Sequence, residues 1–356
     1  MQKRIGYIDI ARGIGILLVI LGHNDFVLIS KFAYQVIYSF HMPLFFFLSG
    51  YFIDTSISFG AFTLKRFNAL LKPYLFTIFM IYFMTISFEK MGFQTAIRRI
   101  AKSLYASGYY LDWVQLWFLP HLFVVSLYAF FIYKLLTRLN NRALRWGILM
   151  GTLWIASLFL QGFYPFSLAV LGKTYTFFGL PFSFDLILLS GFFFVLGSEV
   201  RQITTDRTFD NGFLFFGLGA AVILLNIFFN QRVDFNTRTF ESFPINTAQA
   251  IVGILFILAL SRQIELRVSR LAPLLKYFGR ISLVLLILHV PIQDFWGQKI
   301  MGVINHQSLS IWGGFIMGVA GSVLLYELFI KYNPTVSWWL GRQAELRRQN
   351  TDTAKD

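Results

Sequence analysis

The sequence predicts an all-α integral membrane protein, a polytopic bundle of about ten helices that cross a bilayer. The first observation is composition: 56% of the 356 residues are hydrophobic and only 13% are charged, about half the charged share of soluble domains. The second is that apolar runs of about 20 residues, long enough to span a bilayer, recur along the whole chain. The third is that basic residues lie between these runs, where membrane topology places them.

The candidate spans define one membrane domain. Proline and glycine interrupt the segment 162–182, which we expect to be an outside loop or a re-entrant stretch. No shift in composition and no internal repeat divides the chain, so we expect a single transmembrane domain over 1–335 and a polar cytoplasmic tail over 336–356. The spans are expected near residues 7–29, 34–54, 73–89, 113–136, 144–161, 183–200, 212–230, 245–261, 281–297 and 310–331.

The net charge of +14 fits membrane topology better than a nucleic-acid partner. With both termini in the cytoplasm, roughly 21 lysines and arginines lie inside and roughly 9 outside, as the positive-inside rule requires. The main exception is the loop 90–112, which places Lys90, Arg98, Arg99 and Lys102 outside. We expect residues 98–105 to form an amphipathic helix at the interface, whose basic groups contact lipid phosphates.

The first span carries ionisable residues, which are costly inside a membrane and are therefore functional candidates. Asp9, Arg12 and His23 all lie in it. Arg12 and His23 are separated by nearly three helical turns, so they share one face about 16 Å apart. This face predicts that the span looks into the bundle. A simpler alternative for Asp9 and Arg12 is an ion pair between residues three apart on a helix.

Histidines gather in the outer half of the predicted membrane. Counting 1.5 Å per residue places His23, His41, His121 and His289 between the mid-plane and the outer face. A neutral imidazole is a suitable base for activating a hydroxyl near neutral pH. His121 and His289 could equally be buried structural residues, and His41 could bond a backbone carbonyl freed near Pro43. The histidines lack the spacing of a metal site and the chain has no cysteine, so no metal is expected.

Cations gather at the opposite, inner face. Lys65, Arg66 and Lys72 cluster there, with Arg12 just above them. Such a cluster suits the phosphates of a cytoplasmic donor whose reactive end reaches the histidines through a flexible arm. The alternative is that these are ordinary positive-inside residues.

These residues lie in motifs that resemble a known family. The stretch 9–23, DIARGIGILLVILGH, resembles the opening motif of the acyltransferase-3 family of membrane O-acyltransferases. The stretch 40–50, FHMPLFFFLSG, is similar to the second span of its branch resembling fucose 4-O-acetylases. Further similar motifs stand at 72–74, 116–119, 281–282 and 288–291.

The resemblance implies an enzyme of the bacterial cytoplasmic (inner) membrane. The donor would be a cytoplasmic acyl-CoA, usually acetyl-CoA, acting as a co-substrate with no permanently bound cofactor. The acceptor would be a hydroxyl of an envelope glycan or lipid-linked sugar. Membrane lipids and, in a homo-oligomer, a second copy of the chain would be the other partners. His23 would be the catalytic histidine, Arg12 its essential partner, and Arg66 beside Lys65 part of the donor site.

Two departures from the family pattern extend the expected site. Many members carry a second arginine three residues after the first, but Ala69 stands there, which leaves Lys72 as a substitute. Many also carry a Trp-Ser-Leu motif followed by Glu, but here Phe118 follows Trp117 and no acid follows, which makes His121 a local replacement. The expected catalytic residues are His23, Arg12, His41 and His121, and the donor-binding residues are Lys65, Arg66 and Lys72.

Two other functions remain open from the residues. Intramembrane His, Arg and Asp residues could relay protons in a small-solute transporter or exporter, although the missing repeat counts against that fold. The chain could also be a non-enzymatic partner in polysaccharide assembly. Within acyl transfer, His23 could activate the acceptor directly, or an acyl group could first be carried by a histidine or by Tyr38, Ser39 or Ser49.

Overall fold

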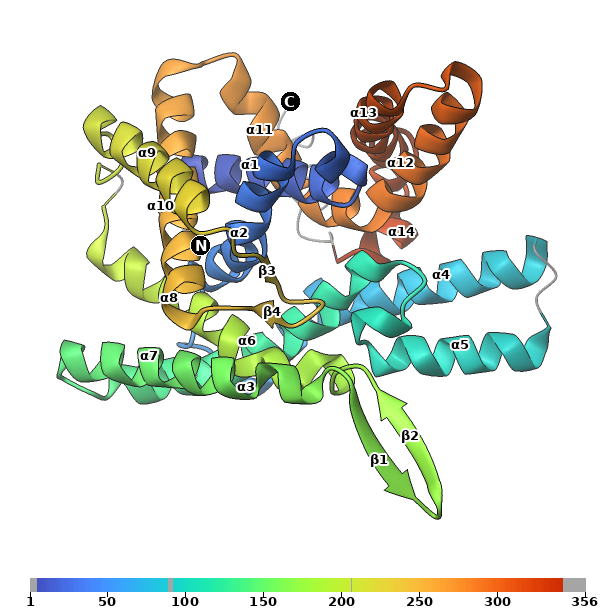
Figure 1. Ribbon diagram of the computed structural model, residues 1–356, viewed down its shortest axis with the longest axis horizontal. Helices are drawn as coiled ribbons and strands as arrows, with labels where there is room; N and C mark the ends of the chain where they lie inside the picture. Colours follow the sequence, from blue (N-terminus) through green and yellow to red (C-terminus); the bar gives the residue numbers. More distant parts are fainter. Residues whose placement is uncertain (1–4, 89–91, 206, 342–356) are drawn as a thin grey trace.

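The computed structural model describes residues 5–88, 92–205 and 207–341, which are mostly helical (Figure 1). Two short antiparallel hairpins join the helices, β1 (Phe166–Val170) with β2 (Lys173–Phe177) and β3 (Val233–Asp234) with β4 (Thr239–Phe240). The predicted helical fold class is thereby confirmed. The helices are α1 (Gly6–Gly22), α2 (Lys31–Gly50), α3 (Phe59–Arg66), α4 (Lys72–Phe88), α5 (Phe93–Tyr105), α6 (Phe118–Thr137), α7 (Arg142–Phe159), α8 (Ile187–Ile203), α9 (Gly212–Phe228), α10 (Phe243–Arg267), α11 (Leu271–Arg280), α12 (Ser282–Ile304), α13 (Gln307–Leu325) and α14 (Pro334–Trp339).

Six helical segments of the described chain are long and apolar enough to cross a membrane, or seven if the bent pair α11–α12 is one span. Helices α1 and α9, of 17 residues each, are shorter than the roughly 20 residues of a typical span. The predicted first span breaks after Gly22 because Asn24 begins a 3-10 turn, its Oδ1 accepting the Phe26 N–H at 3.0 Å. The total of about ten spans and the side of the termini stay predictions. The six segments are Phe59–Ser87, Val114–Thr137, Arg142–Phe163, Pro181–Ile203, Phe243–Arg267 and Gln307–Ile330.

Helix α1 lies inside the bundle, as its polar face predicts. It packs against α2, α10, α11 and α12 (Figure 1), and Ile8, Ile10 and Ala11 are fully buried. Its contact with α11 requires glycine on both helices. A Cβ at Gly13 would lie 2.1 Å from the Leu275 carbonyl oxygen, and a Cβ at Gly279 would lie 2.0 Å from the backbone carbonyl oxygen of Asp9. Small residues thus bring the two backbones together.

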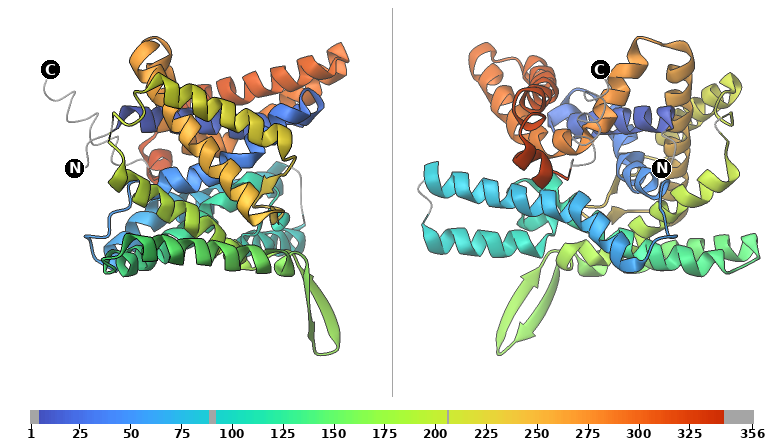
Figure 2. Two further views of the ribbon diagram at one scale, coloured as in Figure 1. Left: turned by 60° about the vertical axis from the view of Figure 1, so that its left-hand side comes forward. Right: turned by 180° about the vertical axis from the view of Figure 1, so that it is seen from behind.

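The predicted amphipathic helix after the third span is confirmed, and it begins earlier than expected, at Phe93. Helix α5 runs antiparallel to α4, and the pair projects from the bundle in two views (Figures 1 and 2). Arg98, Arg99 and Lys102 are exposed, whereas Ala96 is buried. Its place at a membrane interface stays a prediction.

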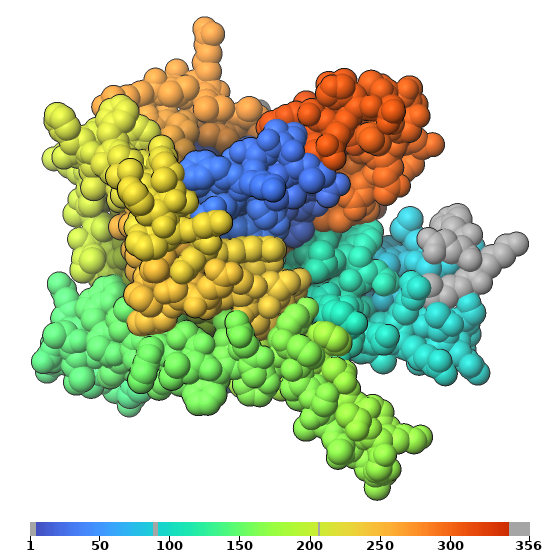
Figure 3. Space-filling view, viewed as in Figure 1, coloured from blue at the N-terminus to red at the C-terminus, as the bar shows by residue number. Residues whose placement is uncertain are grey.

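The ambiguous segment 162–182 is a projecting hairpin. Strands β1 and β2 pair over their full length and extend away from the helices (Figures 1 and 3). Leu171 and Gly172 form the tip with φ of 50° and 74°, as a two-residue hairpin turn requires. Leu171 is 99% exposed.

Segments predicted on one side of the membrane contact one another. On the predicted outer side, Ser107 Oγ donates to the Phe178 oxygen at 2.6 Å, and Arg238 pairs with Asp185. On the predicted inner side, Arg262 pairs with Asp210 at 2.6 Å. The chain therefore has two distinct ends, with the core between them.

Candidate functional site

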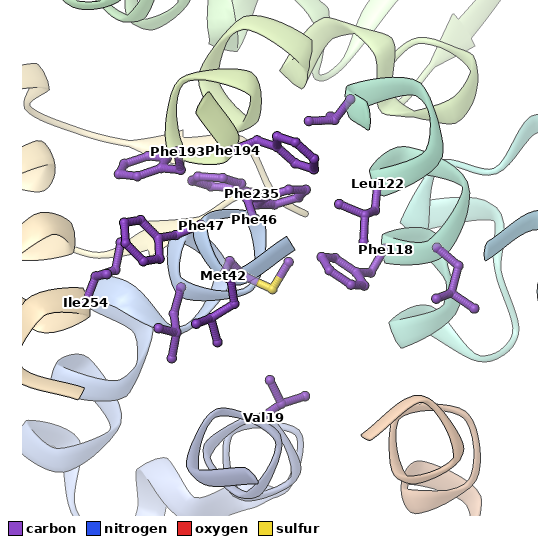
Figure 4. Close-up of a cluster of buried hydrophobic side chains, with 14 of the residues drawn as sticks. Val19, Met42, Phe46, Phe47, Phe118, Leu122, Phe193, Phe194, Phe235 and Ile254 are labelled. Carbon is purple, nitrogen blue, oxygen red and sulfur yellow. The ribbon is translucent and has the colours of Figure 1, made fainter. Parts of the chain in front are cut away.

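One cavity of about 620 Å³ joins the two ends of the bundle and contains most of the predicted site. Its wall is built by α1 and α2, the end of α3, the start of α6, the β3–β4 hairpin and the α11–α12 junction. In Figure 4, Val19 points from α1 toward the side of the core formed by Met42 and Phe118, and all three line the cavity. The predicted residues on the wall are Arg12, His23, His41, Lys65 and Arg66.

Arg12 projects from α1 into the cation end of the cavity. Its Nη1 lies 3.8 Å from Asp9 Oδ1, so the ion pair expected from their spacing is present. Its Nη2 donates to the Leu48 carbonyl at 3.4 Å, and its guanidinium lies 5.6 Å from the centre of the Phe52 ring. The Arg12 side chain remains one-third exposed. The ion pair therefore orients Arg12 without closing it off from the cavity.

Three further cations on this wall have no carboxylate within 4 Å among the described residues: Lys65, Arg66 and Arg280. Arg66 instead packs on Phe62 and Phe194, with its guanidinium 5.2 Å and 5.8 Å from the ring centres. Arg66 and Arg12 are close enough to repel each other. Such a cluster is stabilised by an anion with several oxygens, for which guanidinium groups offer paired donors.

Arg280 was missed in the sequence because it lies in the dense basic stretch 262–280, which topology explains. That stretch contains α11, whose C-terminal Arg280 reaches the cavity where α11 and α12 meet at 84°. A sharp bend between two helices has no hydrophobic period of its own, so the sequence did not signal it.

The two histidines on the wall present the same nitrogen. Nδ1 of His23 lies 2.8 Å from the Val19 oxygen and Nδ1 of His41 lies 3.0 Å from the Ile37 oxygen. A carbonyl can only accept, so each Nδ1 carries the proton and each Nε2 carries a lone pair. The carbonyl left free by Pro43 is that of Ser39, four residues earlier, so His41 does not have the structural role considered from the sequence. Both imidazoles are arranged as neutral bases.

His289 completes a histidine cluster behind this wall. Its ring lies edge to face against His23 with centroids 5.2 Å apart. Nδ1 of His289 bonds the Leu285 oxygen at 2.7 Å, and its buried Nε2 has no partner in the described part of the chain. Three imidazoles on three helices therefore share one tautomer.

His121 and Lys72 do not reach the cavity wall. His121 is fully buried, with its ring nitrogens 3.0 Å from the Phe182 oxygen and 2.7 Å from Ser190 Oγ. Lys72 is buried with its ammonium 4.0 Å from the centre of a Trp338 ring. The structure gives both residues packing partners, and their expected catalytic and donor-binding roles have no support from their positions.

Polar residues outside the predicted set also line the cavity. Asp234 and Asn236 come from the β3–β4 hairpin, and Gln115 comes from the turn before α6. Of the possible acyl carriers, Tyr38 and Ser49 line the wall, and each hydroxyl donates to a backbone carbonyl, of Gly22 and Phe45. The hairpin has a local signal, because Asp234 stands two residues before Asn236 and three before Thr237, which favours a turn capped by the Asp side chain. Nothing local places this turn at the cavity.

A bundle of membrane-capable helices around a cavity with cations at one end and neutral imidazoles at the other is typical of a multi-pass membrane protein with a polar cavity inside its bundle. The sequence profile of the acyltransferase-3 family, described as an acyltransferase domain, matches residues 5–327. The chain belongs to this family and is a membrane acyltransferase. The match includes every residue of the cavity wall. Neither a curated protein nor a solved structure matches the chain.

Proposed function

We propose that the protein transfers an acetyl or similar short acyl group from cytoplasmic acyl-CoA to a hydroxyl of an envelope sugar or polysaccharide, in the bacterial cytoplasmic membrane. The observation that carries this proposal is the two-ended cavity. Cations with no carboxylate within 4 Å among the described residues lie at one end, and imidazoles whose Nε2 carries a lone pair lie at the other. The motif likeness to the fucose 4-O-acetylase branch supports a sugar acceptor.

The cation end suits the donor. Coenzyme A carries its phosphates at one end and its thioester at the tip of a long flexible arm. Arg66, Lys65 and Arg280 would bind the phosphates, because their charges lack carboxylate partners within 4 Å among the described residues. Arg12 and His23 lie about 16 Å apart along α1. The arm would follow this wall and present the thioester to the imidazoles.

The imidazole end suits the acceptor. His23 Nε2 takes the proton of the acceptor hydroxyl while the hydroxyl oxygen attacks the thioester carbonyl carbon. The carbon–oxygen bond of the ester forms, the carbon–sulfur bond breaks, and the proton passes to the departing thiolate, so the products are the ester and free coenzyme A. We assign this role to His23 rather than His41, because His23 is partly open to the cavity whereas His41 is 3% exposed.

Direct transfer fits better than a covalent acyl-enzyme. The hydroxyls of Tyr38 and Ser49 on the wall each donate to a backbone carbonyl, so neither is activated by an adjacent base, as a nucleophile requires. The transporter alternative gains nothing from membership of an acyltransferase family.

The test is transfer of radiolabelled acetyl from acetyl-CoA into the envelope carbohydrate of membrane vesicles. We expect His23→Ala to abolish incorporation, and His306→Ala to retain it, because His306 is an exposed helix cap at the start of α13. Full incorporation by His23→Ala would remove His23 from the reaction. A wild-type protein that transfers no label would refute the function itself.

A further inference from the structure

Among the polar groups of the cavity, the side chain of Asn236 is held at a fixed place yet has no hydrogen-bond partner among the described residues. We propose that its carboxamide binds a hydroxyl group of the acceptor and positions it beside the histidines. This inference rests on the proposed function and identifies where a neutral, polyhydroxylated acceptor is recognised. The argument starts from the hairpin that carries Asn236.

The β3–β4 hairpin is anchored in the core by the residue before Asn236. Phe235 is fully buried and stacks on Phe46 of α2 with ring centroids 5.8 Å apart. Figure 4 shows Phe235 between Phe46 and the pair Phe193 and Phe194 of α8. Asn236 therefore directly follows a residue whose side chain is packed among core rings.

Asp234 holds the backbone on which Asn236 stands. Its Oδ1 accepts the N–H of Asn236 at 3.0 Å and that of Thr237 at 3.3 Å, while its Oδ2 accepts from Arg232 at 2.7 Å. Both carboxylate oxygens are thus bound within the hairpin, so Asp234 shapes the turn rather than facing a ligand unpaired.

Arg238 holds the hairpin from the other side. Its Nη1 donates to the Asn236 carbonyl oxygen at 2.7 Å. Its Nε and Nη2 donate to both oxygens of Asp185 at 2.7 Å and 3.0 Å, and both side chains are at most 1% exposed. Asn236 is thereby fixed through Phe235, Asp234 and Arg238 before any ligand binds, which is the arrangement expected of a recognition group.

The carboxamide of Asn236 is left without partners. Its Oδ1 is buried with no donor among the described residues, and no described acceptor bonds its Nδ2. Orphaned buried amides are costly and rare in proteins. This one lines the same cavity as His23 and His41, so a ligand in the cavity is the natural partner.

Gly108 makes room for this carboxamide. A Cβ at Gly108 would lie 1.8 Å from Asn236 Oδ1 and 3.2 Å from its Nδ2. The clash involves only the movable end of a side chain, so Gly108→Ala shifts the amide while leaving the residue and its backbone anchors in place. The chain thus offers a way to displace the group without deleting it.

The chemistry of this end selects a neutral acceptor rich in hydroxyls. A carboxamide offers one acceptor and two donors, which match hydroxyl groups that both donate and accept. Gln115, on the same wall, adds a second buried amide oxygen that has no donor among the described residues. Its Nε2 donates to the Ile287 carbonyl at 3.2 Å, which fixes the amide in place. Lys65, Arg66 and Arg280, which have no carboxylate within 4 Å among the described residues, lie at the other end of the cavity, so a charged acceptor gains nothing here.

The experiment measures acetyl transfer in vesicles while the two substrates are varied separately. One substrate is acetyl-CoA. The other is envelope carbohydrate from a strain that lacks this protein, and its concentration is expressed as hexose content. We expect Asn236→Ala and Gly108→Ala to raise the apparent KM for the carbohydrate about five- to tenfold, the effect of losing one neutral hydrogen bond. The KM for acetyl-CoA should stay unchanged. Gly162→Ala is the matched control, because nothing lies within 4 Å of a Cβ there.

Each outcome decides the proposal. A wild-type protein that transfers label, with unchanged carbohydrate KM in both variants, overturns the role of Asn236 and leaves the proposed function standing. Equal rises in both KM values, or a loss of folded protein in a detergent melting assay by both variants, would assign Asn236 to structure alone. No transfer by the wild type would overturn the inference together with the function on which it rests.

Discussion

His23 of the α1 C-terminus and His289 of α12 meet edge to face, with ring centroids 5.2 Å apart, and both use Nδ1 to donate to the carbonyl one turn earlier. The Nε2 of His289 is buried and has no hydrogen-bond partner among the described residues, so this ring keeps a lone pair close to His23. A lone pair stabilises positive charge on a neighbouring ring. In the proposed reaction His23 becomes an imidazolium, and His289 would stabilise it.

His289→Phe tests this relationship because it keeps an aromatic ring and removes the lone pair. We expect kcat for acetyl transfer to fall about tenfold with both KM values unchanged, because the lost interaction forms only in the transition state. His121→Phe, a buried histidine away from the cavity, is the control for ring replacement. Wild-type kcat in His289→Phe would show that the contact is packing only.

The cation end can be tested through Arg66. We expect Arg66→Gln to raise the KM for acetyl-CoA by about ten- to a hundredfold, since a charge-assisted bond to a phosphate contributes roughly 1.5–3 kcal/mol. Kinetics in vesicles with acetyl-CoA as the varied substrate measure this. Arg142→Gln is the control, because Arg142 is exposed at the start of α7 and outside the cavity. If Arg66→Gln and Arg142→Gln have the same KM for acetyl-CoA, the donor binds elsewhere.

The buried pair Arg238–Asp185 predicts a stability effect. Breaking it leaves one uncompensated charge in the interior, so Arg238→Met or Asp185→Leu alone should destabilise the fold by about 3–5 kcal/mol. The double variant should recover part of that loss, since replacing both charges leaves neither of them unpaired. Thermal unfolding in detergent measures all three variants. If the double variant loses as much stability as the two single variants added together, the ion pair is not the source of the destabilisation.

The contact of α1 with α11 gives a steric prediction. Gly279→Ala places a methyl group 2.0 Å from the Asp9 backbone oxygen, and backbone cannot rotate away as a side chain can. We expect a loss of stability of about 1–3 kcal/mol or more, and a fall in activity because Asp9 and Arg12 would move. Gly151→Ala on α7 has open space around its Cβ and should melt like the wild type. Matching melting curves for the two variants would contradict the close approach.

The sequence predicted the helix-borne part of the site because helical periodicity determines which residues share a face. Arg12 and His23 follow from one helix, and His41 and Arg66 from counting along two others. The same counting placed His121 and Lys72 at suitable depths, but depth does not determine direction, and both residues turn away from the cavity into packed neighbours.

The hairpin-borne part was out of reach of the sequence. Gly108 meets Asn236, and Asp185 meets Arg238 of the same hairpin, only because three loops that are distant along the chain close over one end of the bundle. No periodic pattern reports such a meeting. The bend of 84° between α11 and α12 was missed for a similar reason, since it lies at Ile281, where the sequence has no proline, while both helices pack against α1.

The rise of α1 between Arg12 and His23, about 16 Å, has a consequence for which activated acids the protein accepts. A donor held by its phosphates at the cation end reaches the imidazoles only if its acyl group lies a comparable distance from those phosphates. Acetyl phosphate, whose acyl group is bonded directly to the phosphate, falls short. In the proposed reaction, the length of the first helix would therefore select the donor before any chemistry occurs.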